Sequence, residues 1–331
     1  MNRYTGDSIG TGARIALISN DALGNFVVVT PLLQMLRFEL KPKQLDYYGG
    51  NRTWELQSES DLFDWSFPLH GSSHEDRAAV AREKRGYDLV INVENTGGAK
   101  VFARMLTTES TRVCGPCEDL HFGNDDRGKL WEDPDWTAKD LVQRYPFLKT
   151  QFIGEIFCRL AYLGGEVPTY KVRSEIPLND IPQVLISTAG TLPEKLWPAE
   201  KWIEMLRFFA SRKMSVGLLG AAPLQQSKFW KGGEAETRLV ETGLLHDLRG
   251  KLTLPQVVGA LQKAKLVLTL DNGILHLAVA AKTPTVGIYR YGIHRLWAPP
   301  SDSLEIITSQ PSGAVNEIPV GAVQEAVCRA L

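Results

Sequence analysis

The stretch from Ala264 to Tyr289, AKLVLTLDNGILHLAVAAKTPTVGIY, decides the fold class of this chain. Its apolar runs predict a buried strand at 266–269, a helix at 274–281 and a second strand at 285–289. A strand, a helix and a strand in this order form a βαβ unit with parallel strands. The Asp271-Asn272-Gly273 turn is therefore expected at the carboxyl edge of a parallel sheet, where open α/β folds bind ligands.

The same alternation extends over the first half of the chain. Apolar runs predict strands at 14–19, 44–48 and 88–93, and the segment 26–40 has helical periodicity, with Pro31 expected near its first turns. Charge, glycine and tryptophan replace the pattern at 117–145, which predicts a long loop or insertion. An amphipathic helix is expected at 151–163, ending at Gly164-Gly165.

The second half repeats the pattern after the polar, proline-containing segment 166–182. It predicts strands at 183–187 and 215–219 and helices at 199–213, 223–242 and 254–263, in addition to the opening stretch. A length of 331 residues suits two domains. We therefore expect an N-terminal α/β domain at 1–165, a linker at 166–182 and a C-terminal α/β domain at 183–331.

The composition is that of an ordinary globular protein. Apolar residues make up 44%, charged residues 23%, and the formal net charge is -1, which argues against a broad nucleic-acid interface. No apolar run approaches membrane-spanning length, and we find no signal-peptide pattern. We expect a cytoplasmic protein. Peripheral contact with the inner face of the membrane through Arg37, Lys41 and Lys43 stays open, and a solvated face is the simpler interpretation of these three.

Two cysteines and two short motifs could indicate redox or metal-binding sites, but we prefer a purely structural interpretation of each. Cys114-Gly-Pro-Cys117 has the spacing of a thioredoxin-type pair, but no apolar helix follows it, so a turn at Gly115-Pro116 is the better interpretation. Asp133-Pro-Asp135 lies in the irregular segment, and the pair His70 and His74 lacks further zinc ligands. We therefore expect no metal site.

The opening stretch itself indicates a phosphate-binding turn. Asp271 and Asn272 suit a helix N-cap, and Gly273 allows close approach of a ligand to backbone amides at a helix N-terminus. The alternative is that Asp271 only caps the helix and His276 only packs in the core.

The sequence LVLTLDNGILHLAVAAKTPTVGIY also resembles the D-S-G-x-x-H-L-A-A-A-x-x-x-P-T-V signature of glycosyltransferase family 9, the bacterial heptosyltransferases. Asp271, Gly273 and His276 match this signature, and Asn272 replaces its small hydroxyl residue. Upstream, STAGTLPEKLWPAEKWIEML is similar to the donor segment of the family at Gly190, Thr191 and Lys195. An ammonium, a hydroxyl and backbone amides together suit a diphosphate.

The N-terminal half resembles the same family. RIALISNDALGNFVVVTPLLQML is similar to its opening, and YDLVINVENTGGAKVFARML to a later segment, while 117–145 has no counterpart. The resemblance implies a GT-B architecture, in which two Rossmann-like parallel-sheet domains face a central cleft. It also implies metal-independent, inverting transfer of heptose from ADP-heptose to a lipopolysaccharide-core acceptor, with the acceptor on the N-terminal domain and the nucleotide-sugar on the C-terminal one.

One departure from the family concerns its general base. The family has an aspartate after Leu-Gly, and this chain has Asn25, an amide that takes up no proton. Either Asp21, in the same loop, or Glu94, at the end of a strand, substitutes, with a slight preference for Asp21. Alternatively the acceptor brings its own charge and Asn25 only positions it, or the protein binds a nucleotide-sugar without turnover.

The sequence therefore predicts a glycosyltransferase without cofactors, in which a nucleotide-sugar and a glycan or glycolipid acceptor are the partners. Lys195, Thr191 and the amides around Gly273 would stabilise the leaving diphosphate. Arg290 or His294, which follow the last strand of the stretch, would contact the diphosphate or the sugar, and surface pairing of these two residues is an equal alternative. The alternatives are a catalytically silent nucleotide-sugar-binding protein and another GT-B activity such as an epimerase or hydrolase.

Overall fold

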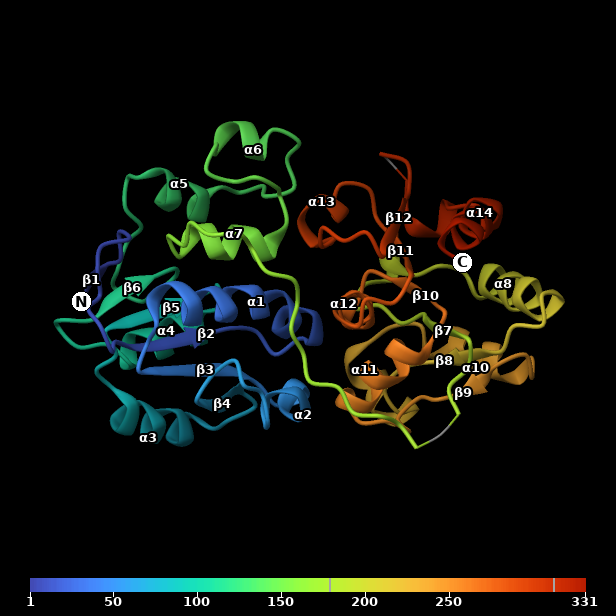
Figure 1. Ribbon diagram of the computed structural model, residues 1–331, viewed down its shortest axis with the longest axis horizontal. Coiled ribbons are helices and arrows are strands. Elements are labelled where there is room, and N and C mark those ends of the chain that lie inside the picture. Colours follow the sequence, from blue (N-terminus) through green and yellow to red (C-terminus); the bar gives the residue numbers. More distant parts are fainter. Residues whose placement is uncertain (179, 312) are drawn as a thin grey trace. The chain divides into compact units, whose positions relative to one another are not determined.

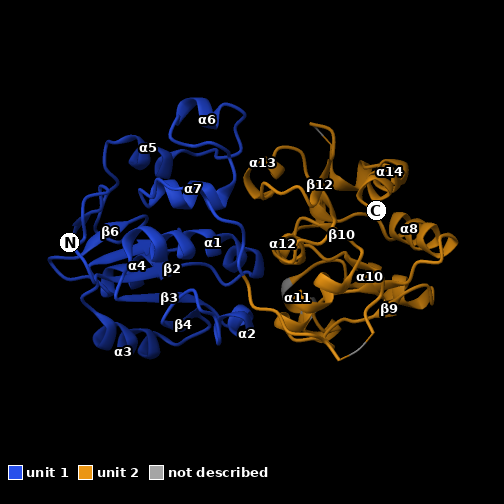
Figure 2. Cartoon of the chain, in the orientation of Figure 1, with its two compact units in different colours: residues 1–171 blue, residues 172–331 orange. Residues whose placement is uncertain are grey.

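The computed structural model describes residues 1–178, 180–311 and 313–331. Residue 179 of the expected linker and residue 312 of the expected C-terminal domain lie outside the described residues. The chain divides into two compact units, residues 1–171 and 172–331, which Figure 2 shows in different colours. The division falls inside the segment 166–182.

Unit 1 is built on a six-stranded sheet in which all neighbouring strands are parallel, in the order β1-β6-β5-β2-β3-β4 (Figure 1). The chain order reverses between β2 and β5, because β3 and β4 lie on one side of β2 while β5 and β6 lie on the other. The strands are β1 (Asn2–Arg3), β2 (Arg14–Ile18), β3 (Gln44–Gly50), β4 (Trp65–His70), β5 (Leu89–Asn92) and β6 (Arg112–Cys114).

Helices connect these strands and bury the alternate side chains of the sheet. Ala16 and Ile18 of β2 pack with Phe102 of α4 in one buried cluster, so Ile15 and Leu17 face the opposite side. The elements are α1 (Leu23–Met35), the π-helical η1 (Leu36–Leu40), η2 (Asn51–Thr53), α2 (Trp54–Gln57), α3 (His74–Lys84), α4 (Gly97–Met105), α5 (Asp126–Glu132), α6 (Leu141–Arg144) and α7 (Ile153–Leu160).

Unit 2 repeats the architecture with a second parallel sheet of six strands, in the order β12-β11-β10-β7-β8-β9. Its chain order reverses between β7 and β10. The strands are β7 (Val184–Ser187), β8 (Val216–Leu218), β9 (His246–Asp247), β10 (Leu266–Leu270), β11 (Thr285–Tyr289) and β12 (Leu304–Thr308). The helical elements are η3 (Pro193–Lys195), α8 (Ala199–Ser211), α9 (Pro223–Phe229), α10 (Gly233–Glu241), α11 (Leu254–Lys263), α12 (Gly273–Ala280), α13 (His294–Trp297), η4 (Val315–Glu317) and α14 (Val320–Ala330).

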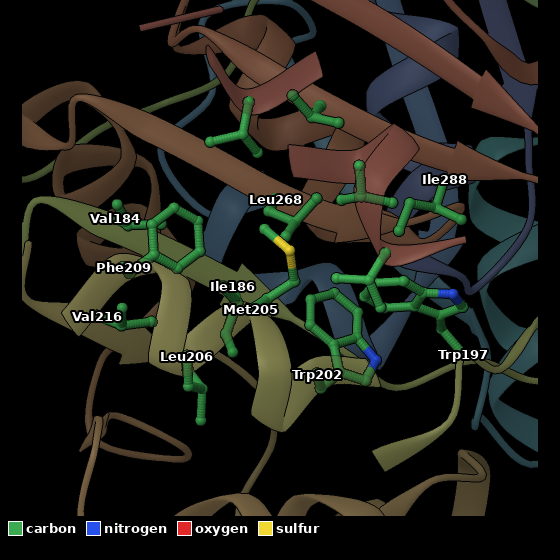
Figure 3. Close-up of a cluster of buried hydrophobic side chains, with 14 of the residues drawn as sticks. Val184, Ile186, Trp197, Trp202, Met205, Leu206, Phe209, Val216, Leu268 and Ile288 are labelled. Atoms are coloured by element: carbon green, nitrogen blue, oxygen red, sulfur yellow. The ribbon is translucent and has the colours of Figure 1, made fainter. Parts of the chain in front are cut away.

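The buried core of unit 2 fixes the predicted donor segment at Trp197, two residues after Lys195. Figure 3 shows Trp197 and Trp202 beside strand residues such as Ile186 and Leu268 in a single buried cluster. The two indole rings meet edge to face with centroids 5.1 Å apart, and Trp197 Nε1 donates to the Ile318 carbonyl oxygen at 2.9 Å. Because Trp197 is anchored in this way, the backbone two residues before it, at Lys195, has a fixed position.

The predicted strands and helices are present, with shifted ends. Helix α1 begins at Leu23, so Asn25 is its third residue rather than the end of a turn. Pro31 lies in the middle of α1 and is buried, although it was expected near the first turns. The expected helix 223–242 is interrupted: Gly232 adopts φ 101° between α9 and α10. A short bridge between Gly190 and Lys231 accompanies the break.

Two further features of the N-terminal half differ in detail from expectation. The segment 117–145, expected to be a long loop or insertion, contains the short helices α5 and α6. Helix α7 ends before the predicted glycine cap, and Tyr162 is the residue in the left-handed conformation, with φ 62°. The N–H groups of Gly164 and Gly165 instead donate to the carboxylate of Glu39.

Within the described ranges, the structure contains no helix with the length and apolarity needed to span a membrane.

Candidate functional site

The two places where strand order reverses collect the predicted site residues. In an open α/β sheet, the loops after the two strands that flank such a reversal diverge and leave room for a ligand at the carboxyl edge. The strand pairs are β2 with β5 in unit 1 and β7 with β10 in unit 2. The residues that follow them are Asp21, Asn25 and Glu94 in unit 1, and Gly190, Thr191, Lys195, Asp271, Asn272, Gly273 and His276 in unit 2.

Asp21 is held by an arginine from the neighbouring strand end. Arg52, in η2 after β3, donates from Nε to Asp21 Oδ2 at 2.6 Å and from its backbone N–H to Oδ1 at 3.2 Å. The two side chains are only 33% and 23% exposed, so the pair is partly shielded from water. Both oxygens of Asp21 therefore already accept hydrogen bonds from Arg52.

Glu94 lies two residues after β5 and is tied to the β2 loop by neutral groups. Asn20 Nδ2 donates to Glu94 Oε2, and the Thr96 N–H donates to Oε1 at 3.2 Å. The same Asn20 accepts from the Ala22 N–H at 2.9 Å through Oδ1. Asn20 thus joins the two loops at the strand-order reversal, and Glu94 has no cationic partner among the residues that the structure describes.

Asn25 is half-buried in the first turn of α1. The helix has no side-chain cap at Ala22, so the amides of its first turn lack the partner that capping would supply. The Asn25 side-chain amide makes no hydrogen bond within the described part of the chain. An amide in this position offers a donor and an acceptor to a polar ligand.

In unit 2, Asn272 and not Asp271 caps helix α12. Its Oδ1 accepts from the Ile274 N–H at 2.9 Å, while its Nδ2 donates to Ser187 Oγ at 3.1 Å and to the Ala189 carbonyl oxygen at 3.0 Å. Asn272 therefore connects the loops after β10 and β7. The Ile274 N–H, one of the amides around Gly273 that were expected to bind a phosphate, is therefore already used by Asn272. The Gly273 N–H makes no hydrogen bond to a described residue.

Lys195 and Asp271 form a shielded ion pair across the same reversal. Lys195 Nζ lies 2.8 Å from Asp271 Oδ2, and the side chains are 18% and 7% exposed. Since an ammonium has three N–H donors, Lys195 keeps further donors for a ligand beside this carboxylate. The pair places a fixed cation where the sequence predicts a diphosphate.

Gly190 and Thr191, the other residues of the predicted diphosphate-binding segment, differ in whether their hydrogen-bond donors are free. Gly190 is buried, and its N–H donates to the Lys231 carbonyl oxygen at 3.3 Å, so this amide is already used. Thr191 is exposed, and its hydroxyl makes no hydrogen bond to the described residues. The donors that remain available to a diphosphate are therefore the Thr191 hydroxyl, the Lys195 ammonium and the Gly273 amide.

His276 is buried in the first half of α12, at 2% exposure. Burial lowers the pKa of its imidazole to about 4, while the negative charge of Asp271 opposes and the positive charge of Lys195 adds to this shift. Its ring meets Trp297 edge to face, with centroids 6.3 Å apart. At neutral pH, His276 is therefore a neutral residue that supports the turn from the interior.

Arg290 follows β11, the strand beside β10. Its Nη1 lies 3.3 Å from Glu194 Oε1, in a pair whose side chains are 31% and 46% exposed. An ion pair as exposed as this one is weak and easily rearranged. Four residues later, burial lowers the pKa of His294. Arg290 is thus a second cation at the same edge of the sheet, and in this structure it makes a surface pair with Glu194.

The remaining sequence candidates have structural roles. Burial raises the pKa of Cys114 to about 12 and also raises that of Cys117, and Gly115 adopts φ 87°, which confirms a turn rather than a reactive thiol pair. His70 ends β4 and shares a hydrogen bond with the Ser19 carbonyl oxygen at 3.1 Å. Asp133 accepts from Arg144 and Tyr145.

Comparison with known proteins gives a family match over more than half of the chain. The model described as glycosyltransferase family 9 (heptosyltransferase) matches residues 133–318. Lipopolysaccharide heptosyltransferase 1 of Escherichia coli (strain K12) is 30% identical over 101 residues, which is 30% of this chain and 30% of that protein. The alignment therefore spans under a third of this curated relative.

Solved structures extend the likeness to nearly the whole chain. The crystal structure of the glycosyl transferase family 9 from Veillonella parvula matches with a TM-score of 0.73 and 14% identity, over 98% of this chain and 99% of that one. E. coli heptosyltransferase WaaC with ADP matches with a TM-score of 0.67 and 18% identity, over 96% and 100%. At such identities the likeness concerns the fold, and it confirms the predicted α/β, GT-B class.

Proposed function

Because the chain belongs to glycosyltransferase family 9, we propose that it transfers heptose from ADP-heptose, with inversion, onto a glycan, lipopolysaccharide-core or small-molecule acceptor. The likeness to E. coli heptosyltransferase WaaC with ADP supports an adenine nucleotide as the leaving group. The nucleotide-sugar is a substrate, and the proposal includes neither a cofactor nor a metal ion. We assign the stabilisation of the negative charge on the leaving diphosphate to groups of unit 2.

The shielded pair of Lys195 and Asp271 is the observation that carries the proposal. When the bond between the anomeric carbon and the diphosphate breaks, negative charge grows on the departing ADP. Lys195, 2.8 Å from Asp271, is a preorganised cation for that charge, and the Thr191 hydroxyl and Gly273 N–H are donors on the same edge. Arg290 adds a second positive charge one strand away.

For the acceptor, we assign the proton transfer to Glu94. The acceptor oxygen attacks the anomeric carbon, its proton passes to a Glu94 carboxylate oxygen, and ADP leaves with the electron pair of the broken bond. Glu94 is better placed than Asp21 because its partners are the neutral Asn20 amide and Thr96 N–H, whereas Asp21 faces Arg52. Asn25 then positions the acceptor through hydrogen bonds.

The test is the dependence of ADP release on the acceptor. Purified protein is incubated with ADP-heptose, with and without lipopolysaccharide-core oligosaccharides, and both ADP and the glycosylated product are measured. Release of ADP together with product, only when acceptor is present, supports the transferase. ADP release or altered sugar with donor alone would indicate a hydrolase or epimerase, and binding without turnover would indicate a silent binder.

A matched pair of variants connects the activity to the site. Lys195→Met removes the ammonium and keeps much of the side-chain length, and Lys263→Met removes an exposed lysine at the end of α11. We expect the first variant to lose about 10²–10³ in kcat, the usual effect of removing one preorganised electrostatic contact. The second should behave as the unmodified protein.

A further inference from the structure

The segment 219–232, which joins β8 to α10, returns to the predicted donor segment and pairs with it. Near its end, Lys231 forms an antiparallel bridge with Gly190. The Lys231 N–H donates to the Gly190 carbonyl oxygen at 2.7 Å, and the Gly190 N–H donates to the Lys231 carbonyl oxygen at 3.3 Å. Backbone pairing therefore holds Lys231 beside the turn that leads to Thr191 and Lys195.

Gly232 keeps the chain close to the donor segment after this bridge. It adopts φ 101°, a left-handed conformation that residues with side chains rarely take. A Cβ built on Gly232 would lie 3.4 Å from Leu196 Cδ2 and 3.6 Å from the Thr188 carbonyl oxygen, so its backbone packs directly against the loop after β7. The backbone position of Lys231 is thus fixed by the bridge and by the packing of the next residue.

The side chain of Lys231 leaves the bridge on the side where Lys195 lies. Two residues directly opposite each other in an antiparallel pair project their side chains from the same face, with Cβ atoms about 4.5–5.5 Å apart. Gly190 has no side chain, but a Cβ built on it would lie 3.3 Å from Lys195 Cβ. The two lysines therefore start from the same face of the donor segment, and their ammonium groups can reach one ligand.

The positive charge of Lys231 is not neutralised by a carboxylate of the described residues. Its side chain is exposed and makes no ion pair or hydrogen bond within the described part of the chain. Glu236, in the first turn of α10, is buried and already engaged, because it accepts from Thr188 Oγ1 at 3.0 Å and from Arg249 Nη1 at 3.2 Å. All three N–H donors of the Lys231 ammonium therefore remain available.

From this arrangement we infer that Lys231 binds the diphosphate of the nucleotide-sugar together with Lys195. A nucleoside diphosphate joined to a sugar carries a negative charge on each of its two phosphates, and two ammonium groups on one face match these charges. The inference rests on the proposed function, because the ligand is the donor of that reaction. Lys231 reaches this ligand from the segment after β8, whereas the donor-site residues assigned above follow β7, β10 and β11.

The two lysines have different parts in this contact. Lys195 is shielded and held by Asp271, so it is preorganised for the charge that grows when the bond to the sugar breaks. Lys231 is exposed, and it meets the charges that the diphosphate carries before the reaction begins. An interaction made equally in the ground state and in the transition state strengthens substrate binding and leaves the rate of the bound complex unchanged.

Calorimetric titration of the full-length protein with ADP tests this inference without any turnover. Lys231→Met should weaken ADP binding about tenfold, the loss of one charge-assisted contact. Lys231→Arg keeps the charge and should retain most of the affinity. Because the side chain has no partner among the described residues, both variants should melt at the temperature of the unmodified protein when ADP is absent. Unchanged ADP binding by Lys231→Met would overturn the inference.

Lys228, an exposed lysine of α9, provides the matched control. Lys228→Met removes the same charge from the same segment but outside the bridge, and it should leave the Kd for ADP unchanged. An equal loss of affinity in this variant would mean that positive charge anywhere in the segment attracts ADP, and the contact assigned to Lys231 would be refuted.

Steady-state kinetics separate Lys231 from Lys195. Lys231→Met should raise the KM for ADP-heptose about tenfold with little change in kcat, whereas Lys195→Met loses kcat. A large fall in kcat with an unchanged KM in Lys231→Met would contradict a role in donor binding.

The outcomes also distinguish this inference from the proposed function. Weaker ADP binding by Lys231→Met, in a protein that transfers sugar to no acceptor, would uphold the diphosphate contact and refute the transferase. Unchanged ADP binding by this variant, in a protein that releases ADP together with product, would refute the contact and leave the transferase standing.

Discussion

Two carboxylates stand at the reversal of strand order in unit 1, and they differ in their partners. Asp21 accepts from the guanidinium and the backbone N–H of Arg52. Glu94 accepts from the Asn20 amide and the Thr96 N–H, both neutral. A general base takes a proton only if a lone pair can reach the acceptor hydroxyl. Glu94 would do so without displacing a cation, and for this reason our proposal names Glu94, although the sequence slightly favoured Asp21.

Substitution of these two carboxylates should affect catalysis unequally. Glu94→Gln should lower kcat by about 10²–10⁴ with little change in KM, because it removes the proton acceptor and keeps the shape of the side chain. Asp21→Asn should lower kcat by less than about tenfold, since the proton acceptor of the proposed mechanism stays in place. Steady-state kinetics with ADP-heptose and acceptor measure both values, and thermal melting of each variant controls for folding.

The opposite pattern has a definite meaning. A large loss in Asp21→Asn with near-normal Glu94→Gln would make Asp21 the base. Full activity in both variants would remove the substitute base altogether and leave an acceptor that carries its own negative charge beside Asn25.

His276 makes stability depend on pH. Its buried imidazole has a pKa of about 4, below the ordinary value of 6.5, so between these pH values the unfolded state holds a proton that the folded state lacks. The contribution of His276 to the free energy of unfolding is therefore fully present above about pH 6.5. It is lost as the pH drops toward 4, by on the order of 3 kcal/mol. Urea unfolding of the unmodified protein and of His276→Gln at several pH values should show a smaller loss in the variant.

The exposed His74, at the start of α3, supplies the control for this measurement. His74→Gln removes an imidazole without touching the turn after β10, so its loss of stability with falling pH should parallel that of the unmodified protein. A His276→Gln variant that also follows the unmodified curve would show that the buried histidine is not the group responsible.

Single residues also show which parts of the site a sequence can reveal. Lys195, Asp271 and Glu94 follow predicted strands, and strand ends are visible in the pattern of apolar residues. The partners Arg52 and Asn20 carry no local signal, because their roles arise from strands far apart in sequence that become neighbours in the sheet. Asn272 was expected at the cap, but its contacts to Ser187 and Ala189 depend on the β7–β10 pairing.

At the scale of elements, the close approach of β3 to the β2 loop depends on Gly50. A Cβ on Gly50 would stand 1.7 Å from Asp21 Oδ1 and 2.5 Å from Asp21 Cα, so the loop or the strand end would have to move. We expect Gly50→Ala to lower the free energy of unfolding by about 1–3 kcal/mol, as overpacking does, and to displace Asp21. Chemical denaturation measures the first effect, and the acceptor KM reports the second.

A glycine in open surroundings provides the matched substitution. Gly97 is the first residue of α4, and a Cβ there would meet nothing within 4 Å. Gly97→Ala should leave stability unchanged or raise it by up to about 1 kcal/mol, because alanine loses less entropy on folding. Equal stability of the two variants would mean that the sheet edge yields to an added methyl group.

Element prediction succeeded where the apolar pattern is long and failed where it is short or overridden. Residues 285–289 and 254–263 match β11 and α11 at both ends, since buried runs and a Thr253 capping box define them locally. The two-residue strands β1 and β9 have no pattern of their own and exist through pairing with β6 and β8. Pro31 lies inside α1 and cannot donate to the Val27 carbonyl oxygen, which instead accepts from Thr30 Oγ1 at 2.8 Å.

At the scale of the whole molecule, the same construction occurs twice. Each unit has a six-stranded parallel sheet with one reversal of strand order, and in each the two loops at that reversal are tied together by an asparagine: Asn20 in unit 1 and Asn272 in unit 2. The charges differ in kind. At the predicted acceptor edge of unit 1, Glu94 has no cationic partner among the described residues, whereas at the predicted donor edge of unit 2 the cations Lys195 and Arg290 each face one carboxylate.

This difference predicts how the stability of the whole chain responds to nucleotide-sugars. A ligand that binds only the folded state adds about 2.7 kcal/mol at 100 times its Kd. At about 2–4 °C per kcal/mol for domains of this size, ADP-heptose should raise the melting temperature by about 5–11 °C, increasing with concentration. UDP- and GDP-sugars should give smaller shifts. Lys195→Met should reduce the shift, and Arg127→Gln, in the other unit, should preserve it. Equal stabilisation by all three nucleotides would contradict the ADP assignment, because a site that holds only the diphosphate does not distinguish the bases.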